Sequence, residues 1–216
     1  MAYPIAKKIL TPIVKFWINK INGLANIPKD RPFIVAANHS SYMDHLIISA
    51  AIVPHINKKI HFLAKKEHFD NFFEALWHRY AGAIPLDRQK GGKEALQFAI
   101  KGLKEGKVIA IYPEGTRTLT GKMQKAKTGV ARLAIAAKVP VIPIGLINTF
   151  KILPKGKHLP KLKKATMNIG KPLYFNHNKP TTKKMLREIT TKIMKEIARL
   201  SKQKKCVNCG SCFSEL

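Results

Sequence analysis

Acidic residues, cysteines and long apolar runs are all scarce in this sequence of 216 residues. Its 12 Asp and Glu residues stand against 40 Lys and Arg, which gives a formal net charge of +28. A chain this basic is expected to meet an anionic partner, such as nucleic acid, an acidic membrane surface or a phosphorylated substrate. A surplus of solubilising lysine accounts for only part of so large an imbalance.

The cysteines are odd in number and crowded near the C-terminus, which argues against a disulfide framework. They are Cys206, Cys209 and Cys212. Their spacing resembles part of a zinc or iron–sulfur site, but a fourth ligand is missing. We therefore expect residues 202–216 to form a flexible Lys- and Cys-rich tail without a metal.

No apolar run reaches the roughly 18 residues that suggest a membrane-spanning helix. The first residues also lack the apolar block and small-residue cleavage site of a signal peptide, so we expect an intracellular protein. Residues 5–21 instead carry apolar side chains at helical spacing, including Trp17, with lysines largely elsewhere. This pattern fits a helix docked on its own core or a helix lying on an anionic membrane, and the overall charge favours the membrane. Residues 1–27 are thus expected to be an amphipathic membrane-docking element.

Short apolar runs that alternate with helical periodicity predict one α/β domain over residues 28–201, with a mixed, mostly parallel sheet flanked by helices. The expected strands lie at 33–37, 60–64, 107–112, 139–146 and 165–169. Pro140 and Pro143 favour an edge or irregular position for the fourth of these strands. Residues 69–80 form an aromatic-rich helical stripe that fits a core, the wall of an apolar cleft or a contact with lipid.

The most informative stretch, residues 38–44, directly follows the first of these strands. Crevices at strand ends are where open α/β sheets bind ligands. Ser40 and Ser41 offer N-cap oxygens for the next helix, which places Asp44 in its first turns. The Asp44 carboxylate is then able to reach the His39 imidazole, fix its tautomer and leave the other ring nitrogen as a base. A His-x4-Asp pair on its own is more often structural than catalytic.

Two further turns carry basic side chains after apolar segments. Residues 82–88 end in Arg88, and the strand at 107–112 runs into Glu114, Gly115, Thr116 and Arg117. Gly115 allows a ligand to approach the backbone closely, and the planar guanidinium of Arg117 suits a phosphate.

Four stretches together resemble, in order and spacing, the motifs of the glycerophospholipid acyltransferase family, most closely its bacterial-type 1-acyl-sn-glycerol-3-phosphate acyltransferases. These stretches are Asn38-His39-x4-Asp44, Gly82 to Arg88, Glu114 to Thr118, and Val139 to Ile144. The resemblance implies transfer of a fatty acyl group from a thioester to the free sn-2 hydroxyl of 1-acyl-glycerol-3-phosphate, giving phosphatidic acid. It also implies direct attack in a ternary complex, without an acyl-enzyme.

The same resemblance implies roles for individual residues. His39 is the general base that takes the hydroxyl proton, and Asp44 orients it. Pro140 and Pro143 lie on the acyl-donor side. Hydrogen-bond donors must face the thioester carbonyl during attack, and backbone N–H groups near His39 are candidates. The residues implied to hold the acceptor phosphate are Arg88, Glu114, Gly115, Thr116 and Arg117, with Lys127 as an addition.

No cofactor is implied beyond the co-substrate, which is acyl-coenzyme A or acyl-acyl carrier protein. The expected partners are an anionic membrane surface and a lysophospholipid acceptor, met at the cytoplasmic face of the membrane by a peripheral or monotopic protein. Two alternatives stand beside this interpretation. One is the same chemistry on glycerol-3-phosphate or another lysolipid. The other is a non-catalytic basic module for membrane or nucleic acid, which is disfavoured because strands with interleaved aromatic and basic residues are absent.

Overall fold

The computed structural model describes residues 4–87, 92–176 and 180–203 of the chain. The strands are β1 (Ile18–Asn22), β2 (Ile34–Ala37), β3 (Ile60–Lys65), β4 (Ile84–Leu86), β5 (Val108–Ile111), β6 (Val141–Ile147) and β7 (Ala165–Ile169). The α-helices are α1 (Pro4–Lys15), α2 (Asp44–Ile56), α3 (Phe72–Tyr80), α4 (Lys93–Lys104), α5 (Gly129–Ala137) and α6 (Lys183–Leu200). Short 3-10 helices are η1 (Leu24–Asn26), η2 (Lys66–Phe69) and η3 (Thr149–Lys151).

The strands form one seven-stranded sheet in the order β1-β7-β6-β2-β5-β3-β4. All neighbouring strands are parallel except β6 and β7, which are antiparallel. The prediction of an α/β domain with a mixed, mostly parallel sheet is confirmed. Within the residues described, none of the helices combines the length and the apolar character needed to span a bilayer.

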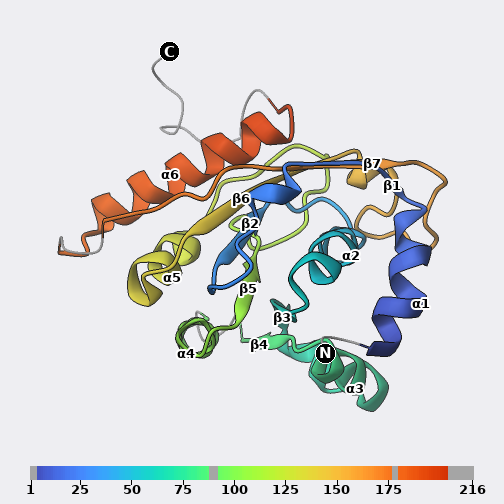
Figure 1. Cartoon of the computed structure of the whole chain (residues 1–216), viewed down its shortest axis with the longest axis horizontal. Coiled ribbons are helices and arrows are strands. Elements are labelled where there is room, and N and C mark those ends of the chain that lie inside the picture. The colour runs from blue at the N-terminus through green and yellow to red at the C-terminus, as the bar shows by residue number, and fades with distance from the viewer. Residues whose placement is uncertain (1–3, 88–91, 177–179, 204–216) are drawn as a thin grey trace.

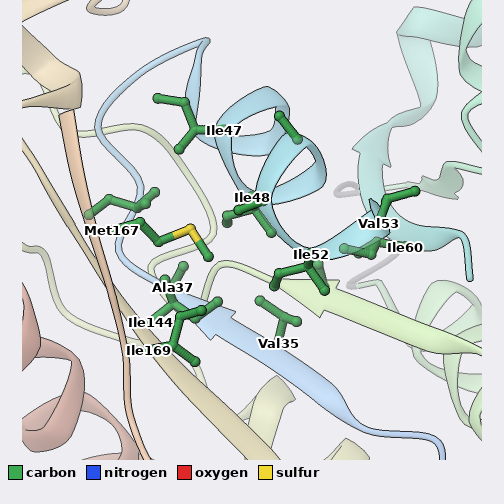
Figure 2. Packing of buried hydrophobic residues seen from close by; sticks show 14 of the residues in the cluster. Val35, Ala37, Ile47, Ile48, Ile52, Val53, Ile60, Ile144, Met167 and Ile169 are labelled. Atoms are coloured by element: carbon green, nitrogen blue, oxygen red, sulfur yellow. The ribbon is translucent and has the colours of Figure 1, made fainter. Parts of the chain in front are cut away.

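Helices cover both faces of the sheet because alternate side chains of each strand point to opposite faces. Val35 and Ala37 of β2 pack under α2, where Ile48 and Ile52 lie over them (Figure 2). Ile34 and Ala36 of the same strand belong to the core beneath α4, α5 and α6. Figure 1 shows α1 and α2 on one side of the sheet and α4, α5 and α6 on the other. The central strand β2 is therefore buried on both sides, and its carboxyl end is a fixed point of the fold.

The helix predicted over residues 5–21 is wrong beyond Lys15, where α1 ends. The chain then extends into β1, which pairs in parallel with β7 at the edge of the sheet. The carbonyl of Trp17 accepts a hydrogen bond of 2.8 Å from the N–H of Ala165, so extended pairing replaces the helical bond. Apolar spacing alone did not reveal this strand, since its partner lies far along the sequence. The sheet therefore begins before the division expected after residue 27.

The two prolines near β6 do not place this strand at an edge, since β6 lies between β7 and β2. Pro140 precedes the strand, and its carbonyl accepts from the N–H of Ile34 at 2.9 Å. The carbonyl of Pro143 accepts from the N–H of Gly170, also at 2.9 Å, one residue beyond the end of β7. Pro140 lies where the pairing of β6 with β2 starts, and Pro143 lies where the pairing of β6 with β7 stops. Their missing N–H groups are therefore tolerated.

Candidate active site

A cavity of about 720 Å³ lies where the turns after β2 and β5 meet α1, α2, β3 and α3. Its lining combines His39, Thr116 and Arg117 with apolar side chains such as Leu46 and Phe62. A mainly apolar cavity of several hundred Å³ with a few polar groups is the usual form of a small-molecule site. The two motif-bearing turns, 75 residues apart in sequence, thus share one cavity.

The structure brings His39 and Asp44 into contact. Nδ1 of His39 lies 2.8 Å from Oδ2 of Asp44, whose side chain is fully buried. The same carboxylate oxygen accepts the backbone N–H groups of Ser40 at 2.7 Å and Ser41 at 2.8 Å. A carboxylate that accepts Nδ1–H fixes the imidazole tautomer and leaves Nε2 as the nitrogen able to take a proton.

The serines of this turn act differently from the expected N-caps. Helix α2 has Met43 at its N-cap position, without a side-chain capping bond. Oγ of Ser41 accepts from the N–H of Met43 at 3.1 Å and donates to the carbonyl of Leu153 at 2.8 Å. Oγ of Ser40 bonds to the hydroxyl of Thr149 at 2.8 Å. Both serines therefore tie the turn to the segment that follows β6.

Asn38 and Glu114 hold the backbone on either side of His39. The Asn38 amide donates to the carbonyl of Leu146 at 2.9 Å and accepts its N–H at 2.7 Å, which continues the pairing of β2 with β6. Oε1 of Glu114 accepts the His39 N–H, and Oε2 accepts the Gln124 N–H, each at 2.8 Å. Both oxygens thus hold backbone donors, which supports a positioning role for Glu114, and the phosphate-binding role expected for it stays a prediction.

Glu114 is only 4% exposed, and this burial raises the pKa of its carboxyl to about 7. Its two backbone hydrogen bonds oppose the shift, and the nearby Asp44 adds to it. Through its two hydrogen bonds, Glu114 links the turn after β2 to the segment after β5.

Tyr112, directly after β5, is a site residue that sequence patterns did not reveal. Its ring stacks on the His39 imidazole with centroids 3.8 Å apart and planes inclined by 8°. Among the residues that the structure describes, its buried hydroxyl has no hydrogen-bond partner. Burial also raises the pKa of that hydroxyl well above its usual value. The available signal was its place at a strand end, two residues before Glu114.

A second missed residue, His45, follows Asp44 and also lines the cavity. Desolvation by burial lowers the pKa of His45 to about 4, so this imidazole is neutral at physiological pH. His45 therefore lies next to His39 and Asp44 without adding a positive charge to the site. Its position directly after the His-x4-Asp motif was the only sequence signal.

Among the expected phosphate-binding residues, Thr116 and Arg117 reach the cavity. The guanidinium carbon of Arg117 lies 3.5 Å from the centroid of the Tyr42 ring, a cation–π contact that orients it. Gly115 has a φ of +74°, and a Cβ there would lie 3.4 Å from Cε of Lys127. Lys127 therefore packs beside Gly115 with its side chain exposed, outside the cavity lining.

Other expected site residues are not brought to this cavity. Pro140 and Pro143 are buried in and before β6, on the far side of β2 from β5, and neither is part of the lining. The expected acyl-donor role for these prolines therefore has no support in their position. Two further predictions fall outside the described residues: Arg88, and the tail with Cys206, Cys209 and Cys212.

The backbone N–H groups of residues 39–42, which were candidates to face the thioester carbonyl, donate hydrogen bonds within the protein. Those of residues 40 and 41 donate to Asp44, and that of His39 donates to Glu114. The N–H of Tyr42 donates to the carbonyl of Leu153 at 3.0 Å. These four donors thus hold the shape of the turn.

Comparison with known proteins identifies the family of this chain. Residues 19–147 match the family model described as Acyltransferase. The chain is 33% identical over 155 residues to the 1-acyl-sn-glycerol-3-phosphate acyltransferase of Bacillus subtilis (strain 168), a match that covers 72% of this chain and 73% of that protein. It is 28% identical over 204 residues to the protein of the same name from Streptococcus pneumoniae (strain ATCC BAA-255 / R6), covering 91% of this chain and 73% of that protein.

A solved structure gives the same result at the level of the fold. The crystal structure of the 1-acyl-sn-glycerophosphate (LPA) acyltransferase PlsC from Thermotoga maritima matches with a TM-score of 0.71 and 27% identity. The match covers 91% of this chain and 80% of that one. The motifs, the sheet that carries them and the matched relatives agree, and the chain therefore belongs to the acyltransferase family and is an enzyme of that class.

Proposed function

We propose that this enzyme transfers a fatty acyl group from an acyl thioester to the sn-2 hydroxyl of 1-acyl-glycerol-3-phosphate, giving phosphatidic acid for phospholipid biosynthesis. The observation that carries this proposal is the 2.8 Å contact between His39 and Asp44 in a cavity that also contains Arg117. The cavity thereby combines a base, a cation for a phosphate and an apolar space for an acyl chain. The names of the matched relatives point to the same reaction.

His39 acts as the general base in this mechanism. Nε2 takes the proton of the sn-2 hydroxyl while its oxygen attacks the thioester carbonyl. Asp44 accepts Nδ1–H and stabilises the imidazolium that forms, and the Tyr112 ring holds the imidazole plane by stacking. Collapse of the tetrahedral intermediate breaks the C–S bond, and the imidazolium returns its proton to the departing thiolate. No acyl-enzyme is formed in this sequence.

Arg117 is the phosphate-binding residue that the described geometry supports best. Its guanidinium is held against Tyr42 at the cavity, and Thr116 adds a hydroxyl next to it. Lys127 packs beside Gly115, and its N–H donates to the carbonyl of Pro113 at 2.8 Å, which holds this turn. Glu114 is assigned a positioning role, through the His39 N–H, in place of direct phosphate contact. The acyl donor is acyl-coenzyme A or acyl-acyl carrier protein, and a net charge of +28 favours approach of either anionic donor.

The substrate would enter from an anionic membrane at the cytoplasmic face, on which the enzyme docks peripherally through α1. Ile9, Ile13 and Phe16 are 56%, 52% and 53% exposed, although large apolar side chains are usually buried. Helix α3 lies near the N-terminal end of α1 (Figure 1), and both helices line the cavity. Phe72 and Phe73 of α3 are even more exposed, at 75% and 79%. A lysophospholipid would then pass from the bilayer into the cavity between these helices.

Replacement of the base tests the mechanism. We expect His39→Ala to lower the rate of palmitoyl transfer from palmitoyl-coenzyme A to lysophosphatidic acid in anionic vesicles by about 10²–10⁴, because a positioned base typically contributes that much. His158→Ala removes an exposed histidine of the loop after β6 and serves as the matched control. Unchanged activity in a folded His39→Ala variant would contradict the mechanism. Glycerol-3-phosphate is offered in parallel, and its preferred acylation would redirect the proposal to that acceptor.

Removal of the guanidinium tests phosphate recognition. We expect Arg117→Ala to raise the KM for lysophosphatidic acid by roughly 10- to 100-fold with a smaller effect on kcat, since a charge-assisted hydrogen bond is worth about 1.5–3 kcal/mol. Arg132→Ala, on the exposed side of α5, is the control for loss of one positive charge. Equal KM values in the two variants would remove Arg117 from the phosphate site.

The raised pKa of Glu114 makes stability depend on pH. The folded state disfavours the charged carboxylate, so the wild type loses stability as pH rises from about 4.5, where the unfolded chain ionises, to about 7, where the folded protein ionises. Urea unfolding gives the free energy of unfolding of the wild type and of Glu114→Gln. Between pH 4.5 and 7 the wild type should lose up to about 3 kcal/mol of this free energy relative to the variant. Glu188→Gln, exposed on α6, should show no such shift. If the free-energy difference between wild type and Glu114→Gln did not change with pH, the raised pKa of Glu114 would be refuted.

The docking face is tested by vesicle sedimentation with phosphatidylglycerol. We expect Ile13→Ser to lower the partition constant roughly tenfold, because full burial of such a side chain is worth roughly 1.5–3 kcal/mol. Phe98→Ser, which removes an apolar residue at least as exposed from α4 on the other face of the sheet, should leave binding unchanged. Equal losses in both variants would show that α1 does not direct docking.

A further inference from the structure

A second group of chemically active side chains lies beside the acyltransferase site. His68 of η2 and both Glu74 and His78 of α3 place one ligand atom each within 4.8 Å of one another. All three side chains also line the cavity that contains His39. None of them has a part in the acyl transfer described above. We propose that His68, Glu74 and His78 bind a zinc ion at the wall of this cavity.

The backbone already presents these ligands together. Glu74 and His78 are separated by one helical turn and share a face of α3. The start of α3 is fixed by Asn71, whose side chain accepts the N–H groups of Phe73 at 3.0 Å and Glu74 at 3.3 Å. Across from this turn, Nδ1 of His68 lies 3.1 Å from Oε2 of Glu74. The centroids of the His68 and His78 rings are 5.2 Å apart, and the ring planes are inclined by 34°.

The donor set favours zinc over the hard divalent cations. Two imidazole nitrogens and one carboxylate oxygen are common zinc ligands, whereas calcium and magnesium prefer oxygen donors alone. Zinc bonds of about 2.0–2.2 Å place tetrahedral ligand atoms roughly 3.3–3.6 Å apart. The pair formed by His68 and Glu74 is already near this separation, and the partly exposed side chains approach the rest of the way by rotation. The fourth position is left to water from the cavity.

A metal here would strengthen a part of the cavity wall that has little support from the core. Ala75 is the only buried residue among the nine of α3. The hydrogen bond from His68 to Glu74 lies at an exposed position and stabilises little by itself. Zinc would join η2 to α3 through three stronger bonds and fix the helix that carries Trp77 and Tyr80 of the lining. Zinc occupancy would therefore set the shape of the cavity where the acyl chain is proposed to lie.

Zinc binding to the purified full-length chain tests this inference without any measurement of acyl transfer. The background variant is Cys206→Ser, Cys209→Ser, Cys212→Ser, because three clustered thiolates bind zinc on their own. Isothermal titration near neutral pH should give one zinc per chain. We expect His68→Gln and His78→Gln each to weaken binding at least about tenfold, and His158→Gln to leave it unchanged.

Two further readouts separate loss of a ligand from loss of the fold. Zinc should raise the Tm of the background protein and have a much smaller effect on His78→Gln, whose Tm without metal should equal that of the background. Cobalt should give the intense visible absorption of a tetrahedral site in the background protein alone. Absence of zinc binding, or binding that neither histidine substitution weakens, would overturn the proposal. These outcomes leave the acyltransferase function untouched, because that proposal depends on His39 and Arg117.

Discussion

The Asp44 carboxylate is the interaction on which the site depends. One buried oxygen accepts the His39 imidazole and the backbone N–H groups of Ser40 and Ser41. Asp44 is also the first residue of α2, where the helix dipole favours a negative charge. The group that orients the base is therefore the same group that shapes the turn between β2 and α2. Removing the carboxylate would disturb the local fold and the chemistry together.

The turn after β2 is held by its neighbours on both sides of the sheet. Glu114 and Thr118, after β5, bind the N–H and the carbonyl of His39, while Asn38 pairs with Leu146 of β6. Because β6, β2 and β5 are adjacent strands, each contact is set by strand register. Helix packing on both faces fixes that register, so the precision of the site derives from the hydrophobic core beneath it.

Local patterns in the sequence predicted what depends on local structure. Apolar runs identified β2 and β5, and the spacing of His39 and Asp44 anticipated their contact, because five residues at a strand–helix junction bring the two side chains within reach. The stacking of Tyr112 on His39 was missed because it depends on how β5 is aligned with β2. The same long-range pairing turned the end of the predicted N-terminal helix into β1 and placed β6 inside the sheet despite its prolines. The contacts of Glu114 with the N–H groups of His39 and Gln124 were also out of reach, because sequence does not reveal which donors a carboxylate faces.

The His39 ring is clamped on two sides, by Asp44 at Nδ1 and by Tyr112 on its face. A free imidazole rotates about two torsions and loses that freedom each time it must meet a substrate. Here the imidazole loses its rotational entropy once, when the chain folds. The favourable free energy of folding the sheet offsets this loss. Each catalytic cycle then starts from a base that is already aligned, so only the substrate has orientational freedom left to lose.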